Sequence, residues 1–190
     1  SFFLPLDRIE RVLRKLQEGR PVTRGTLQTT FRSEPYDELR RLGLTEGSER
    51  LARNTFPDQT GMLTVEQVIP DSPAFGVLEP GDILISVNDE LVTQFVPLAD
   101  VLDSYVGKEI RIHVERGGRG IDAIITVDDL HAITPAEYIE FGDGVVNQLS
   151  YQQARHYNRP ATGVYVANPG YLLSRAAIPR GAVIVEMDGE

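Results

Sequence analysis

The chain has 190 residues, a formal net charge of −9 and 41% hydrophobic residues. This length fits one large or two small domains, and the composition is typical of a globular chain rather than a disordered one. The acidic balance argues against a dedicated nucleic-acid-binding surface, because phosphate contacts need a basic face. The lack of cysteine excludes disulfides, thiol nucleophiles and cysteine-ligated zinc or iron–sulfur centres.

The N-terminal region predicts a basic amphipathic helix over residues 7–18, with apolar residues at three- and four-residue spacing. Asp7 suits its N-cap, and Gly19 followed by Pro21 ends it. The chain begins with Ser rather than Met and shows no signal-peptide pattern, so we expect a piece of a longer protein. One face is either solvated or a docking face for an acidic surface of another domain, and it carries Arg8, Arg11, Arg14 and Lys15.

The following residues predict a mixture of short strands and short helices. In chain order these are a strand entered from a loop at 23–31, helices at 35–42 and 46–54, a strand at 61–69, a turn at 70–74 leading into a short helix, a strand at 83–87, a helix at 97–105, and strands at 109–115 and 121–127. Within the strand at 61–69, Met62, Val65 and Val68 are expected to be the more buried positions. There is no regular βαβ alternation, which favours a small α+β domain with a partly open β-barrel or sandwich capped by short helices.

The sequence repeats itself at a spacing of about 100 residues. Residues 61–65 (GMLTV) are echoed by residues 163–167 (GVYVA), and residues 80–90 are echoed by residues 179–190. Two copies of one supersecondary unit imply two copies of one domain. The second copy stops at its turn, so its helix and hairpin are expected beyond residue 190. We therefore expect the second unit to depend on contacts with the first unit, another chain or further sequence.

The first copy resembles a PDZ domain, through the run GDILISVND at 81–89, the helix after it, Gly107 and the next strand. More narrowly, it resembles the PDZ domain that follows the protease domain in HtrA/Deg serine proteases. Residues 2–5, the basic helix and Arg24-Gly25 are similar to the junction between protease and PDZ domain in that family.

The motif HAITP at 131–135, the helix beginning at 35–38 and the degenerate second copy resemble the fungal, nuclear, pro-apoptotic branch of the family, which has duplicated protease and PDZ units. The resemblance implies a linker helix at 1–22, a first PDZ domain at 23–130 and a C-terminally truncated second PDZ domain at 131–190. The catalytic triad of such a protease lies in the preceding trypsin-like domain. No Gly-Asn-Ser-Gly-type nucleophile loop is present, so the chain itself is not expected to be an enzyme.

The resemblance also implies a peptide-binding site in the first PDZ domain. The peptide would add as a strand at a sheet edge, and loop amides would hold its terminal carboxylate. Leu98, Leu102 and Tyr105 share a helix face and would line an apolar pocket, although the two leucines also fit a purely structural core. Gln28 stands where the family loop usually has a second glycine. The expected peptide-binding residues are Arg24, Gly25, Thr26, Leu27, Gln28, Thr29, Leu98, Leu102 and Tyr105.

The corresponding loop of the second copy lies at 141–146, where Asp143 would repel a carboxylate. A regulatory or packing role is therefore expected for that copy. The three histidines are not at metal-ligand spacing, and no metal or cofactor is expected.

The expected partners are hydrophobic C-terminal or unfolded peptide segments, the parent's protease domain and a further copy in an oligomer, but not nucleic acid or a membrane. The family resemblance predicts nuclear and cytoplasmic localisation. An alternative is an architectural tandem that fixes protease geometry without binding free peptide, with the helices at 35–54 capping the groove. A third alternative, an autonomous enzyme, has no visible nucleophile–base pair to support it.

Overall fold

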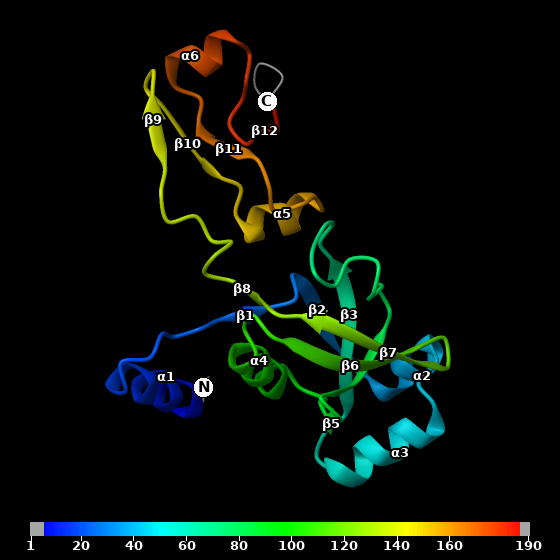
Figure 1. Cartoon of the computed structure of the whole chain (residues 1–190). Helices are drawn as coiled ribbons and strands as arrows, with labels where there is room; N and C mark the ends of the chain where they lie inside the picture. The colour runs from blue at the N-terminus through cyan, green and yellow to red at the C-terminus, as the bar shows by residue number, and fades with distance from the viewer. Residues whose placement is uncertain (1–5, 187–190) are drawn as a thin grey trace.

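The computed structural model describes residues 6–186 and has the α+β composition that the sequence predicts (Figure 1). Within the described residues, six helices accompany open sheets, and none of these sheets closes into a barrel. A six-stranded and a two-stranded sheet occupy residues 25–129, called unit one below. A four-stranded sheet occupies residues 139–184, called unit two. None of the described helices is long and apolar enough to span a bilayer.

Helix α1 (Leu6–Gln17) forms where the sequence predicts it, but its apolar stripe faces solvent. Leu6 and Leu16 are 66% and 60% exposed, and the helix lies apart from the sheets of both units (Figure 1). Lys15 Nζ donates to Thr23 Oγ1 at 3.1 Å. The side chains of Asp7, Arg8 and Arg11 lie outside the description, as do residues 2–5, so the basic face and the family junction stay predictions.

Unit one is a PDZ-like antiparallel sheet with helices on both faces. Its elements are β1 (Gly25–Thr26), β2 (Thr29–Pro35), α2 (Tyr36–Leu42), α3 (Glu46–Thr55), β3 (Gly61–Val68), β4 (Ile83–Val87), β5 (Glu90–Leu91), α4 (Phe95–Ser104), β6 (Glu109–Arg116), β7 (Arg119–Thr126) and β8 (Asp128–Asp129). The strand order is β2-β3-β4-β6-β7, with β5 paired to β4, and β1 pairs with β8. Strand β2 therefore lies at an edge. The short helix expected after the turn at 70–74 is absent, because residues 70–78 form successive turns.

The sheet of unit one is buried on both faces, which explains the continuous apolar runs in its central strands. Met62, Leu63, Thr64 and Val65 are all buried in β3, whereas Val68 is only partly buried. The face toward α4 holds the main core, which includes Leu63, Leu84, Leu98 and Leu102.

Helices α2 and α3 cover the opposite face of the sheet, through a second cluster that includes Tyr36, Leu39, Ala52, Met62 and Ile83. The buried Glu115 carboxylate of β6 fixes the start of α3. It accepts hydrogen bonds from the Thr45 amide and hydroxyl at 2.8 Å and from Ser48 Oγ at 2.6 Å. The expectation that these helices cap the groove beside α4 is therefore wrong, because burial of their apolar faces draws them to the other side of the sheet.

Unit two repeats part of this architecture. Its elements are β9 (Ile139–Phe141), β10 (Gly144–Gln148), α5 (Tyr151–Tyr157), β11 (Val164–Asn168), α6 (Gly170–Arg175) and β12 (Val183–Ile184), in the strand order β12-β11-β10-β9. The Val65 amide donates to the Asp82 carbonyl and the Gly81 amide to the Val65 carbonyl, both at 2.8 Å. In unit two Val166 makes the same pair of bonds with Ala182 and Gly181, both at 2.9 Å.

This hydrogen-bond pattern corrects the register of the repeat. Aligning Gly61 with Gly163 makes Ala167 the equivalent of Val65. The hydrogen bonds of the structure instead make Val166 the equivalent of Val65. The strand face decides the register, since Val65 and Val166 are both buried in their cores.

Candidate peptide-binding site

A groove lies between the edge strand β2 and helix α4 of unit one. Among the described residues β2 pairs only with β3, so its other edge carries no strand. A pocket of about 360 Å³ lies there, lined by the start of β2, one face of α4 and Gly25. Leu98 and Leu102 line it and also belong to the core, and their role in peptide binding stays a prediction. An open strand edge beside an apolar helix face is the arrangement that strand addition requires.

The loop between β1 and β2 makes its turn at Gln28. This residue adopts φ +52°, in the left-handed region that favours glycine, so the side chain at this position does not prevent the turn. Gln28 Nε2 donates to Asp128 Oδ2 at 2.9 Å, which directs the side chain toward β8. Gln28 does not line the pocket between β2 and α4.

Two amides of this loop already have partners within the protein. The Gly25 amide donates to Asp103 Oδ1 at 2.9 Å, and the Gln28 amide donates to Thr26 Oγ1 at 2.9 Å. The carboxylates of Asp103 and Asp128 therefore flank the loop with negative charge. Arg24 Nη1 lies 3.9 Å from Asp103 Oδ2, and its positive charge offsets part of this negative charge. A peptide carboxylate would have to compete with these contacts for the Gly25 and Gln28 amides.

The structure brings together some of the residues predicted from the sequence. Arg24, Gly25, Thr29, Leu98 and Leu102 line the pocket. The remaining four do not line it, namely Thr26, Leu27, Gln28 and Tyr105. Leu27 is a core residue, and Tyr105 caps the C-terminal end of α4.

Several lining residues were missed by the sequence analysis. Phe95, Val96 and Ala99 of α4 line the pocket, as do Phe31 of β2 and Glu66 of β3. The helix begins at Phe95 rather than at Pro97, so extending its apolar spacing by one step toward the N-terminus would have found Phe95.

Unit two contributes the remaining wall of this pocket. Tyr151 and Arg155 of α5 line it together with residues of β2 and α4. Gln67 Nε2 of β3 donates to the Arg155 carbonyl at 3.0 Å and to Asn158 Oδ1 at 3.1 Å, which holds the C-terminal end of α5 against unit one. Partial burial raises the pKa of the Tyr151 hydroxyl, and Arg155 opposes this effect. No pattern within either repeat indicates this contact.

In unit two, strand β9 occupies the edge of β10 that corresponds to the open edge of β2 in unit one. Strand β9 pairs antiparallel with β10, with Phe141 opposite Gly144 and Ile139 opposite Val146. Both units shift register at the same place, after Thr30 in β2 and after Val145 in β10. The segment paired with β9 thus corresponds to the start of β2, which lines the groove in unit one. A peptide cannot add a strand to that part of β10 while β9 is paired.

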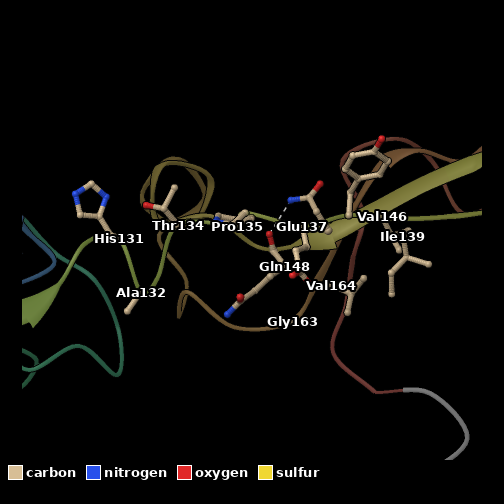
Figure 2. A pocket seen from close by; sticks show the side chains of 13 residues that line it. His131, Ala132, Thr134, Pro135, Glu137, Ile139, Val146, Gln148, Gly163 and Val164 are labelled. Carbon is tan, nitrogen blue, oxygen red and sulfur yellow. Dashed lines mark hydrogen bonds between the residues drawn. The ribbon is translucent and has the colours of Figure 1, made fainter. Parts of the chain in front are cut away.

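A second pocket, of about 610 Å³, lies in unit two (Figure 2). The segment at 131–139 forms one side, and Val146 of β10, Val164 of β11 and the preceding Gly163 form part of the other. By register, Val164 corresponds to Leu63, yet Val164 is 40% exposed and Leu63 is 0% exposed. Within the described residues, no helix or strand of unit two covers this face, and Val164 lies open to the pocket.

Comparisons with known proteins agree with this architecture. A model of the PDZ-like domain family matches residues 132–190, and a PDZ domain model matches residues 64–116. Protease Do-like 7 of Arabidopsis thaliana is 44% identical over 201 residues, covering 100% of this chain and 18% of that protein. The pro-apoptotic serine protease nma111 of Aspergillus clavatus is 50% identical over 166 residues, covering 87% of this chain and 16% of that protein.

Among solved structures, the HtrA-type protease AlgW with decapeptide aligns with a TM-score of 0.49 and 22% identity, over 66% of this chain and 35% of that one. The fold and the two family matches define a chain with two PDZ domains. Its relatives are Do-like and nma111-type serine proteases, and it spans less than a fifth of the length of the two just compared. The matched part is the PDZ region, and no catalytic domain is evident in it.

Proposed function

We propose that unit one binds extended, hydrophobic peptide segments by strand addition between β2 and α4, and that the tandem thereby regulates an HtrA-type serine protease of which it is a part. The observation that carries this proposal is the edge of β2 that no described strand covers, which lies beside a pocket of about 360 Å³. Phe95 is 50% exposed at this pocket, and Val96 and Ala99 line it as well. Apolar side chains of a bound peptide would bury this surface.

The contacts within the loop favour extended segments over capture of a peptide end by loop amides. The Gly25 and Gln28 amides are already engaged, and Asp103 and Asp128 place negative charge beside them. A peptide that adds as a strand satisfies the backbone groups of β2 without displacing these bonds. Proteolysis and cell-death signalling by a parent protein are predictions from the names of the relatives, and nuclear localisation is a prediction from the family resemblance.

The test is a fluorescence-anisotropy titration of the chain with hydrophobic peptides, each as free acid and as C-terminal amide. We expect micromolar binding of both forms, roughly −8 kcal/mol. Ala99→Lys places a charged chain in the groove and should abolish binding, since Ala99 lines the pocket and lysine is a good helix former.

Two controls make this test specific. Ser104→Lys adds the same charge at an exposed residue of α4 outside the pocket and should leave binding unchanged. Leu102→Lys is unsuitable, because Leu102 belongs to the core and its loss confounds binding with folding. No binding by the folded wild-type chain, or equal binding by the Ala99→Lys variant, contradicts the proposal.

An architectural role is the second candidate, because Gln67 joins the two units through hydrogen bonds to Arg155 of α5 and to its C-cap residue Asn158. In that case the tandem would set the geometry of the parent protease and bind no free peptide. A null result for every peptide, together with a stability loss in Gln67→Ala, would favour this function.

A further inference from the structure

The groove of unit one is completed by a helix of unit two. Tyr151 and Arg155 of α5 line the same pocket as Thr29 and Ala99. The helix is held there by Gln67, which donates to the Arg155 carbonyl. The Arg155 main chain is thus fixed on unit one while its side chain remains exposed.

The charges that line this pocket differ in how they are paired. The four charged residues are Arg24, Glu66, Asp103 and Arg155. Arg24 and Asp103 lie 3.9 Å apart, and Asp103 also accepts the Gly25 amide. Within residues 6–186, neither the Arg155 guanidinium nor the Glu66 carboxylate forms an ion pair. Of the two arginines in the described lining, Arg155 is therefore the one without a carboxylate partner.

We propose that unit two determines the specificity of the groove in unit one, with the Arg155 guanidinium pairing with a carboxylate of the bound peptide. The inference rests on the proposed peptide binding and adds the ligand's chemistry: a hydrophobic segment that carries a carboxylate near the wall formed by α5. The carboxylate is that of the peptide C-terminus or of an acidic side chain. Tyr151 adds an aromatic surface to the same wall.

The strand pairing in unit two supports these two roles, in which unit one adds the peptide as a strand and unit two supplies a charged wall of the groove. Strand β9 occupies the part of β10 that corresponds to the groove edge in unit one. Unit two is thereby prevented from adding a peptide strand at that position, while its helix α5 is available to the neighbouring groove. The two observations are independent, since one concerns strand pairing and the other the lining of a pocket.

The test compares four forms of one fluorescent hydrophobic peptide by anisotropy at low salt: free acid or amide at the end, and glutamate or glutamine within the segment. The wild-type chain should bind a carboxylate form roughly two- to fivefold more tightly than its neutral partner, as expected for a partly exposed ion pair. Salt should remove this preference. The acid–amide comparison tests whether the terminal carboxylate is recognised, and the glutamate–glutamine comparison tests whether a side-chain carboxylate is recognised.

Variants assign the preference to α5. Arg155→Gln should abolish it, so that the charged and neutral forms of the peptide bind this variant equally. Arg180→Gln removes the same charge from an exposed position of unit two outside the pocket, and should retain the preference. Glu66→Gln should enlarge it by removing a repulsive carboxylate. Gln67→Ala should reduce it because α5 loses its anchor.

Failure of the inference is distinguishable from failure of the proposed function. Equal wild-type binding of all four peptides, or a preference that survives Arg155→Gln, overturns the role of Arg155 while strand addition stands. Absence of binding by every peptide refutes the groove itself and the inference with it. Circular dichroism of each variant checks that it is folded.

Discussion

Replacing Arg116 by methionine should strongly destabilise unit one, because it leaves a buried carboxylate without its counter-ion. Arg116 holds Asp82 with two hydrogen bonds, from Nε to Oδ1 at 2.6 Å and from Nη2 to Oδ2 at 2.8 Å. Asp82 is 0% exposed, and its other bond comes from the Glu79 amide at 2.8 Å. Hydrogen bonding to Asp82 raises the pKa of Arg116 above its already high ordinary value, so the guanidinium is charged at every accessible pH.

The expected magnitude follows from the burial of each partner. Removing one member of a buried ion pair costs roughly 3–5 kcal/mol. The Arg116 side chain is 32% exposed, so water can enter its place and the lower end applies, about 3 kcal/mol. For a domain of about 100 residues this lowers Tm by roughly 12 °C or more. Thermal and urea unfolding followed by circular dichroism measure the loss.

The double variant Asp82→Ala/Arg116→Met is the matched control, because it leaves no buried charge behind. Unit two has Ala182 in the same turn with the same two backbone bonds, so the turn forms without a carboxylate. We expect the double variant to recover part of the stability that Arg116→Met loses. A loss below about 1 kcal/mol for the single variant, or a double variant less stable than the single one, would refute this reasoning.

Two further predictions concern the pH dependence of unit one and the geometry of its groove. A hydrogen bond from Arg40, helped by Arg53, lowers the pKa of Glu49 from 4.5 to about 2. The resulting stability is present above the unfolded-state value and is lost as the pH falls toward 2. The Tm of wild type should therefore exceed that of Glu49→Gln at pH 6 and converge with it near pH 2, and a gap that stays constant would contradict the assignment. A Cβ at Gly25 would lie 2.1 Å from the Leu102 carbonyl oxygen, so Gly25→Ala should displace β1 from α4, weaken peptide binding and cost roughly 1–3 kcal/mol. Gly47→Ala, with nothing nearer than 3.9 Å inside α3, should instead stabilise the chain by roughly 0.5–1 kcal/mol, and unfolding curves that rank the two variants equally would count against this explanation.

Local patterns in the sequence predicted most elements to within one or two residues. The strand at Ile83–Val87 follows from a continuous apolar run, and the hairpin β6–β7 from alternation around a glycine-rich turn. The short helix after residue 74 was predicted wrongly for unit one, where residues 70–78 form turns. Gln28 was identified as a departure from the family pattern, but only its φ of +52° shows that it adopts the left-handed conformation that favours glycine.

The sequence by itself determined most of the elements, because these depend on side-chain periodicity and turn residues within short windows. The repeat and the PDZ resemblance came from motifs matched along the chain. Tertiary structure decided which strand edge is open, which face α2 and α3 cover, and which residues form the groove. Gln67 and Arg155 meet although they are far apart in the chain, and β9 closes β10 while β2 stays open. Such pairings depend on how whole elements bury their apolar faces against one another. A short stretch of sequence does not contain this information.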